Sequence, residues 1–264
     1  MAQQIRRPHD YTDITELPGA GATREQRARL LNRYQTANRY ASSKRILEVA
    51  CGAGLGLGYL ARSARRVIGG DYTATLLHVA QSHYAGRLPL IQLDAHALPF
   101  PHASFDLVLI FEALYYMRHP ELVLAEARRV LDERGIVLLC TVNKDCSGFS
   151  PSRFSTRYFS VPELRDLLDG VGFTRTDFFG AFPGAASTSL GRVISLVRRA
   201  AVLLNLVPKT LDGRAALKRL FYGPLVPLGP EVDDQMAPPE ALVRLPADSA
   251  TAEFKIIYAV AGVR

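Results

Sequence analysis

The sequence predicts an α/β fold in which a mostly parallel sheet carries helices on both faces. Strand-like apolar runs alternate with helical patterns along most of the chain, which is typical of a parallel sheet built from β–α–β units. One of these runs leads directly into an acid and a glycine-rich turn, residues 48–56. With 264 residues and 48% hydrophobic content, the chain can bury one large core, so we expect a single domain over residues 1–264.

The elements follow from local patterns in chain order. An N-terminal helix is predicted over residues 24–40, and Ser160 and Glu163 have the spacing of a capping box, which predicts a helix over 161–170. The other expected elements are strands near 45–50, 67–71, 90–94, 105–111, 136–142, 173–180 and 254–260, and helices near 54–64, 73–84 and 120–131.

The glycine-rich turn indicates a nucleotide-like ligand. In an open α/β sheet, such a turn places backbone N–H groups at the carboxyl edge of a strand, where these folds bind nucleotides. The spacing does not match a dinucleotide fingerprint, because the third glycine expected after Gly52 and Gly54 is replaced by Leu57. Glu48 would repel a pyrophosphate and suits a cationic ligand instead.

Two further acids stand at predicted strand ends. Asp71 lies nineteen residues after Gly52, where a ribose diol is commonly bound by a carboxylate. Asp94 ends the next strand and is followed by Ala95. Together with Glu48, these acids predict a site for a positively charged nucleoside.

The chain resembles the class I S-adenosylmethionine-dependent methyltransferases, in particular their small-molecule type 11 branch. The resemblance covers residues 44–180 and is carried by four ordered blocks: Glu48-x-Ala50-x-Gly52-x-Gly54, the strand end at Asp71, Asp94-Ala95-x-x-Leu98-Pro99-Phe100-x-x-x-Ser104-Phe105-Asp106, and Arg129-Val130-Leu131-x-x-x-Gly135. It implies a Rossmann-like seven-stranded sheet with an antiparallel last strand, and S-adenosylmethionine as cofactor. The family normally has glycine where this chain has Ala50.

The resemblance also implies the roles of individual residues. The turn at Gly52 would lie along the methionine part of the cofactor, Asp71 would hold the ribose, and Asp94 with Ala95 would face the adenine. The full set of predicted cofactor-binding residues is Glu48, Ala50, Gly52, Gly54, Asp71, Tyr72, Asp94, Ala95 and Phe111.

Residues 111–119 are expected to line the acceptor side of the pocket. His119 is the candidate general base for a hydroxyl acceptor, and Tyr115 and Tyr116 are candidates for orienting it. The Asn/Asp-Pro-Pro-Tyr motif of amino-group DNA methyltransferases is absent there, which counts against base methylation. Tyr11 is a candidate lid residue, by resemblance.

The predicted reaction is O-methylation of a small or lipid-linked glycosyl or natural-product acceptor. Two alternatives stay open. One is a methyltransferase directed at RNA, and the other is a protein with the methyltransferase fold that transfers no methyl group.

An insertion of about 70 residues separates the last two predicted strands, where the family usually has a tight hairpin. Apolar residues at helical spacing between Leu190 and Leu204 predict a helical cap. Residues 187–222 hold seven basic residues and one acid, a net charge of +6. This charge is explained by a solvated helix face, by binding of an acidic acceptor or by contact with a membrane. The basic residues are not interleaved with aromatic residues, which counts against nucleic-acid binding.

The expected organisation is an N-terminal lid and helix over residues 1–43, a cofactor-binding core over 44–180, a basic cap over 181–252 and a final strand over 253–264. The three cysteines match no zinc pattern, so no metal site is predicted. No secretory signal and no transmembrane run is expected, so we predict a cytoplasmic location, with peripheral contact at the inner membrane face as an alternative. The oligomeric state is left open.

Overall fold

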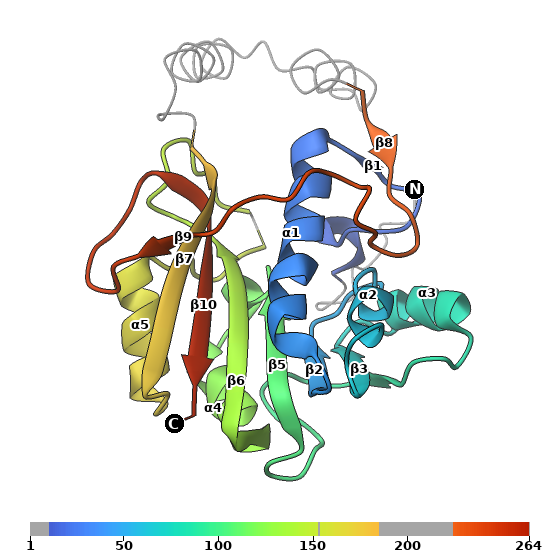
Figure 1. The fold of residues 1–264 in the computed structure, drawn as a ribbon, viewed down its shortest axis with the longest axis horizontal. Helices are drawn as coiled ribbons and strands as arrows, with labels where there is room; N and C mark the ends of the chain where they lie inside the picture. The colour runs from blue at the N-terminus through green and yellow to red at the C-terminus, as the bar shows by residue number, and fades with distance from the viewer. Residues whose placement is uncertain (1–10, 153, 185–223, 264) are drawn as a thin grey trace, which may run out of the picture.

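A computed structural model describes residues 11–152, 154–184 and 224–263 (Figure 1). Its centre is an eight-stranded mixed sheet with the strand order β4-β3-β2-β5-β6-β10-β7-β9. The strands of this sheet are β2 (Arg45–Val49), β3 (Arg66–Asp71), β4 (Leu90–Gln92), β5 (Phe105–Phe111), β6 (Leu131–Val142), β7 (Arg175–Pro183), β9 (Val243–Leu245) and β10 (Phe254–Gly262).

Five helices cover the two faces of this sheet: α1 (Arg24–Ala41), α2 (Leu57–Ala61), α3 (Ala74–Tyr84), α4 (Pro120–Val130) and α5 (Val161–Gly170). Apolar side chains of α1, α2 and α3 belong to one hydrophobic cluster, and those of α4 and α5 belong to a second. The layers are therefore helix, sheet and helix, with α1 in front of the central strands in Figure 1. The predicted fold class, a mostly parallel sheet between helices, is confirmed.

The sheet has one strand more than the predicted seven. β10 pairs antiparallel with both β6 and β7, as the resemblance implies. The additional strand is β9, which comes from the insertion and pairs antiparallel with the free edge of β7. Because β9 has only three residues and mostly exposed side chains, its sequence carries little strand signal.

Several boundaries differ from the predictions for identifiable reasons. α2 begins at Leu57 and not at residue 54, because Gly52 and Gly54 adopt left-handed conformations and the turn continues to Gly56. β6 begins at Leu131 directly after α4, five residues before the predicted start. The predicted helix at 161–170 is confirmed at both ends, and both hydrogen bonds of the capping box between Ser160 and Glu163 are present.

The predicted cap helix and the basic residues 187–222 lie outside the described residues, which resume at Pro224. The described part of the insertion runs back along the core. β8 (Val226–Pro227) pairs with β1 (Gly21–Ala22), and the following chain crosses α1 on its way to β9 (Figure 1). This crossing brings residues 224–242 close to the glycine-rich turn, where the N–H of Val232 donates to the carbonyl of Leu55.

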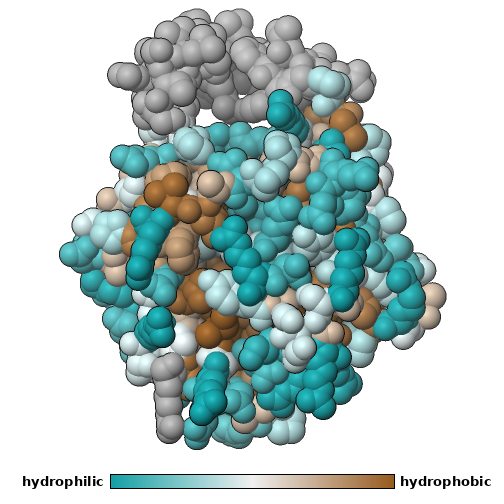
Figure 2. All heavy atoms as spheres, viewed as in Figure 1, coloured by the Kyte–Doolittle hydropathy of each residue, from teal (hydrophilic) through white to brown (hydrophobic). Residues whose placement is uncertain are grey.

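Polar side chains cover most of the face shown in Figure 2, and apolar ones form separate patches between them. Among the described residues, no helix is long and apolar enough to span a bilayer.

Candidate functional site

A cavity of about 920 Å³ opens at the carboxyl edges of the central parallel strands. Its walls come from the turn after β2, the ends of β3 and β5, the loop after β4 and the face of α1. Between β2 and β5 the strand order reverses, which makes this the switch point where open α/β sheets bind ligands. The volume is near the upper end of the range for ligand sites, about 300–1,000 Å³, and suits a cofactor together with an acceptor.

The structure brings most of the predicted site residues together in this cavity. The exception is Gly54, which is not among the lining residues and instead accepts a hydrogen bond from the hydroxyl of Tyr84 at 2.7 Å. The predicted residues that line the cavity are Glu48, Ala50, Gly52, Asp71, Tyr72, Asp94, Ala95, Phe111, Tyr115, Tyr116 and His119, together with the predicted lid residue Tyr11.

The turn after β2 has left-handed backbone at Ala50 and at Gly52, with φ of 59° and 57°. A Cβ atom at Gly52 would lie 2.7 Å from the methyl group of Thr15, so only glycine fits there. Ala50 adopts the same backbone conformation with a side chain, at a cost of about 1–2 kcal/mol. This conformation explains why the family prefers glycine at position 50.

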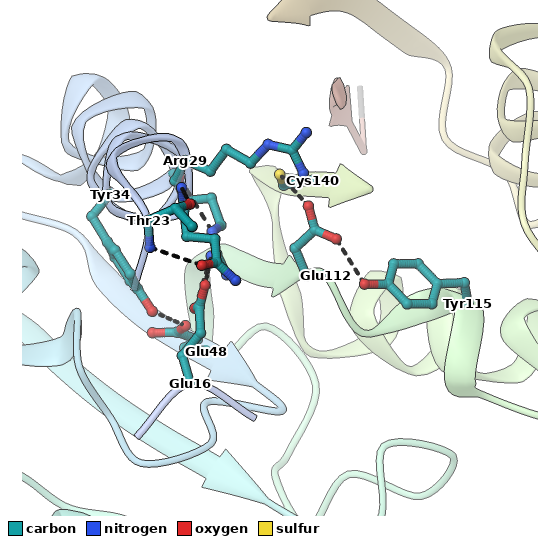
Figure 3. Close-up of polar contacts among 10 residues, drawn as sticks. Glu16, Thr23, Arg29, Tyr34, Glu48, Glu112, Tyr115 and Cys140 are labelled. Atoms are coloured by element: carbon teal, nitrogen blue, oxygen red, sulfur yellow. Dashed lines mark hydrogen bonds and ion pairs between the residues drawn. The ribbon is translucent and has the colours of Figure 1, made fainter. Parts of the chain in front are cut away.

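Glu48 lies at the base of the cavity, buried beneath the turn. One of its oxygens, Oε1, accepts a hydrogen bond from the hydroxyl of Tyr34 at 2.7 Å (Figure 3). The other, Oε2, is buried and has no hydrogen-bond partner among the described residues. Burial raises the pKa of Glu48 to about 7, although Tyr34 and Arg33 act in the opposite direction. A cationic group of a ligand would donate a hydrogen bond to Oε2 and would favour the charged form of Glu48.

The predicted cofactor fits this observation, since its ammonium group would supply the missing donor to Glu48. Asp71 has a different environment, because its two oxygens accept hydrogen bonds from the backbone N–H groups of Gly52 and Thr73, both at 2.8 Å. Asp71 therefore ties the end of β3 to the turn after β2. Each oxygen keeps a second lone pair for a ligand hydroxyl.

Asp94 and Ala95 line the cavity from the loop after β4. Asp94 Oδ1 accepts hydrogen bonds from the backbone N–H of His96 at 2.9 Å, and lies 2.7 Å from its ring Nδ1. The strand itself ends at Gln92, two residues earlier than predicted, and Asp94 forms an isolated bridge with Ala97. This turn presents the segment to the cavity at the position where the resemblance places the adenine.

Glu112 belongs to the segment 111–119 that the sequence predicts on the acceptor side, but the sequence reasoning gave it no role of its own. It follows β5 directly, has left-handed backbone with φ of 51°, and lines the cavity. Its Oε2 accepts a hydrogen bond from the hydroxyl of Tyr115 at 2.7 Å, and the thiol of Cys140 lies 3.8 Å from its Oε1 (Figure 3). Burial raises the pKa of Glu112, and Arg33 partly offsets this effect. The signal was available, since Glu48 and Asp71 are also acids at strand ends.

His119 lies at the rim of the cavity, immediately before α4. Its side chain is 56% exposed, and Nδ1 is 3.3 Å from a carboxylate oxygen of Glu121. Tyr116 and Tyr115 lie deeper, with ring centroids 4.5 Å apart, and the ring of Tyr11 is 6.0 Å from that of Tyr116. The three tyrosines form an aromatic wall on the acceptor side.

The N-terminal segment, residues 11–23, covers one side of the cavity. Glu16 of this segment forms an ion pair with Arg33 of α1, whose Nη2 lies 2.7 Å and 2.8 Å from the two carboxylate oxygens. Arg33 is 8% exposed, so this pair fixes the segment against the helix. Tyr11, Ile14, Thr15 and Glu16 all line the cavity from this side.

Comparison with known proteins gives matches to methyltransferases. Residues 47–139 match the model of a family described as "Methyltransferase domain". A "Probable S-adenosylmethionine-dependent methyltransferase" of Mycolicibacterium smegmatis is 35% identical over 164 residues, which are 60% of this chain and 62% of that protein. The chain thus spans less than two thirds of the length of this relative.

Two further relatives are named for lipid acceptors. A "Probable phthiotriol/phenolphthiotriol dimycocerosates methyltransferase 2" of Mycobacterium ulcerans is 43% identical over 101 residues, covering 36% of this chain and 38% of that protein. A "Fatty-acid O-methyltransferase" of Mycolicibacterium smegmatis is 36% identical over 121 residues, covering 41% and 43%.

Solved structures share the fold. A SAM-dependent methyltransferase from Thermotoga maritima superposes with a TM-score of 0.57 at 15% identity, covering 90% of each chain. The strand order, the glycine-rich turn and these matches support membership of the class I S-adenosylmethionine-dependent methyltransferase family, with the direct family match over residues 47–139.

Proposed function

We propose that the protein methylates an oxygen atom of a lipid-like or lipid-linked glycosyl acceptor, with S-adenosylmethionine as the methyl donor. The observation that carries this proposal is the apolar mouth of the cavity. Five large hydrophobic side chains are exposed among the described residues, and three of them line this cavity. Leu122 at 50% and Phe154 at 38% exposure form this apolar mouth, whereas Tyr72 at 44% follows Asp71 on the cofactor side.

The cofactor side of the cavity supports the donor. In this proposal Glu48 Oε2 would accept a hydrogen bond from the ammonium group, Asp71 and Tyr72 would hold the ribose, and Asp94 would face the adenine. When bound, this cofactor supplies an activated methyl group on a sulfonium, so the protein needs chiefly to align the acceptor and exclude water. The N-terminal segment and the tyrosine wall are placed to exclude water from the space between them.

The apolar mouth supports the acceptor class. Burying exposed apolar area contributes about 25 cal/mol per Å², so a hydrocarbon chain that lies across the mouth would add to affinity. A compact polar acceptor would leave these side chains in water. The relatives named for phthiotriol and fatty-acid acceptors support the same class.

The basic segment 187–222 carries a related proposal, because it lies in the insertion that returns over α1 toward the site. Its net charge of +6 suits an acidic head group on the acceptor or the anionic surface of a membrane. In this account the protein works at the inner face of a membrane, where lipid-linked acceptors are found.

The acceptor class is tested with two glucosides that differ only in the length of the aglycone. Octyl β-D-glucopyranoside and methyl β-D-glucopyranoside are offered below the micellar concentration, and methyl transfer is followed by mass spectrometry. We expect kcat/KM at least tenfold higher for the octyl compound, since two buried methylene groups at about 0.8 kcal/mol each suffice.

Leu122→Ser should reduce this preference, because Leu122 lines the mouth of the cavity. Val243→Ser is the matched control, since Val243 is 47% exposed on β9 and does not line the cavity. Equal use of the two glucosides would contradict the lipid-like acceptor, and methyl incorporation into total RNA in their place would favour the RNA alternative.

A further inference from the structure

Glu112 is placed to act on the acceptor, and it is a different residue from the base expected from the sequence. We propose that Glu112 takes the proton from an acceptor hydroxyl during methyl transfer, with Tyr115 as the residue that positions it. This proposal rests on the proposed function. It adds that the group that receives the methyl is a neutral hydroxyl and not a carboxylate.

The location of Glu112 comes first. β5 pairs with β2, and Ile110 of β5 is the partner of Val49, so the chain after β5 leaves the sheet beside the glycine-rich turn. Glu112 therefore stands at the switch point and lines the same cavity as the turn that would hold the methionine part of the cofactor. Its left-handed backbone costs about 1–2 kcal/mol for a residue with a side chain, and such strain is common at functional sites.

The hydrogen bonds of Glu112 leave it free to accept a proton. Tyr115 uses one lone pair of Oε2, and Cys140 makes a long contact of 3.8 Å to Oε1. A carboxylate has about four acceptor positions, so two remain. Tyr115 also fixes the rotamer of the carboxylate, because its hydroxyl lies 2.7 Å from Oε2.

The charges around Glu112 favour a base over a structural ion. Arg33 faces it from α1, but that guanidinium is already paired with Glu16. Among the described residues, Glu112 makes no ion pair within 4.0 Å. The positive charges of Arg33 and Arg29 act on it from a greater distance. The titratable and charged groups that face it are Arg29 and Arg33 of α1, Glu16 of the N-terminal segment, Tyr115, Tyr116, Cys140 of β6 and Tyr258 of β10.

The proposed step balances in atoms and charge. The acceptor oxygen forms a bond to the methyl carbon, the carbon–sulfur bond breaks with its electron pair left on sulfur, and the hydroxyl proton passes to Glu112. The positive sulfonium and the negative carboxylate become a neutral thioether and a neutral carboxylic acid. No net charge is created in the cavity, which suits a buried site.

This arrangement selects among oxygen acceptors. A hydroxyl needs a base and can donate a hydrogen bond to Glu112. A fatty-acid carboxylate is already ionised near neutral pH, and the charge of Glu112 would repel it. The structure therefore favours an acceptor whose alcohol or sugar hydroxyl reaches Glu112 while its hydrocarbon part lies across the apolar mouth.

The test compares Glu112→Gln with His119→Ala, the variant of the base expected from the sequence, and with Glu121→Gln, an exposed control outside the cavity lining. Octyl β-D-glucopyranoside and decanoic acid serve as acceptors. We expect Glu112→Gln to lower kcat on the glucoside by about 100-fold or more, with cofactor affinity changed less than twofold. Relative use of decanoic acid should rise in the same variant, because the repelling charge is gone.

The pH profile separates a base from a structural residue. With S-adenosylmethionine held at saturating concentration at every pH, kcat/KM of the wild-type protein on the glucoside should fall on the acidic side as Glu112 becomes protonated, and this limb should be absent in Glu112→Gln. Tyr115→Phe removes a hydrogen bond that favours the charged form, so it should move the limb to higher pH. If Tyr115 contributed only packing, the Tyr115→Phe variant would show its acidic limb at the same pH as the wild type.

A second readout does not depend on turnover. In protein labelled with ¹³C at the glutamate carboxyl carbons, the resonance that disappears in Glu112→Gln reports Glu112. We expect it to titrate above the ordinary glutamate range and to shift when the glucoside is added to the complex with S-adenosylhomocysteine. An ordinary titration with no response to the glucoside would overturn the inference.

The outcomes of the two proposals are distinguishable. A wild-type protein that methylates decanoic acid and not the glucoside contradicts the hydroxyl acceptor, and one that methylates neither contradicts the proposed function. A glucoside activity that survives in Glu112→Gln and disappears in His119→Ala leaves the proposed function intact and overturns the role of Glu112.

Discussion

Glu48, Asp71 and Glu112 are three of the carboxylates that line the cavity, and each has a different set of partners. Glu48 has one hydrogen bond from Tyr34 and one buried oxygen with no partner among the described residues. Asp71 accepts two backbone N–H bonds from neighbouring loops, and Glu112 is bonded to Tyr115. From these differences we infer three roles: binding a cation, shaping the turn and accepting a proton.

Glu48→Gln tests the first of these roles through the stability of the protein. Glutamine keeps the acceptor for Tyr34 and removes the buried charge. The folded-state pKa of Glu48 is raised to about 7 from an ordinary value of 4.5, so the folded protein binds this proton more tightly than the unfolded chain. In the wild-type protein, the protonated Glu48 therefore contributes its full stabilisation below about pH 4.5, and this contribution is lost as the pH rises through about 7.

The variant should therefore gain about 2–3 kcal/mol in free energy of unfolding, relative to wild type, between pH 5 and pH 8. Urea unfolding at both pH values measures this difference. In the same variant the affinity for S-adenosylhomocysteine should fall by about 1.5–3 kcal/mol, the range for a hydrogen bond to a charged group. A stabilised variant with unchanged cofactor affinity would remove Glu48 from the site.

At the scale of elements, α1 joins the site to the rest of the fold. Its buried polar residue Asn32 donates to the carbonyl of Glu240 at 3.0 Å and accepts from the hydroxyl of Tyr258 at 2.7 Å. One side chain thus connects α1, the insertion and β10. The same helix supplies Tyr34 to Glu48 and Arg33 to Glu16.

Asn32→Ala should destabilise the protein by about 1–3 kcal/mol, because it leaves the buried hydroxyl of Tyr258 without its acceptor. Asn38→Ala is the matched control in the same helix, since Asn38 is exposed and accepts a hydrogen bond from the hydroxyl of Ser63. Thermal unfolding of the two variants measures the difference. Equal stability of both variants would show that Asn32 does not connect these elements.

Much of the element order could be predicted because the strong signals are local. The helix over 161–170 is defined by its capping box, and the turn at Gly52 by the acids and glycines around it. β9 could not be predicted, because its three residues are a strand only where they meet the edge of β7. The pairing of Glu16 with Arg33 is also tertiary and leaves no periodic pattern in the sequence.

The grouping of the predicted site residues in one cavity has the same local origin, whereas their individual roles stay predictions. Parallel strands bring their carboxyl ends to one edge, so Glu48, Asp71 and Phe111 meet in the cavity as the strand pattern predicts. The role of His119 stays a prediction, although its exposed position at the rim gives it less contact with the cavity than Glu112 has. Choosing between these two residues required the depth of each side chain, which spacing does not report.

At the scale of the whole molecule, two parts of the chain that are far apart in sequence are joined beside the cavity. The N-terminal segment covers one side, and β8 pairs with β1 of that segment, so the insertion and the segment are fastened together. Val232 is bonded to Leu55 in the turn after β2. Changes in the insertion should therefore reach the cofactor side of the cavity as well as its mouth.

The central claim is that this cavity holds S-adenosylmethionine through Glu48 and the turn at Gly52. Isothermal titration of the protein with S-adenosylhomocysteine, and separately with NAD, at pH 8 tests it most directly. We expect one binding site for S-adenosylhomocysteine, an affinity that falls about tenfold at pH 6 as Glu48 takes up its proton, and no heat from NAD. Binding of NAD, or no binding of S-adenosylhomocysteine at pH 8, would contradict the account.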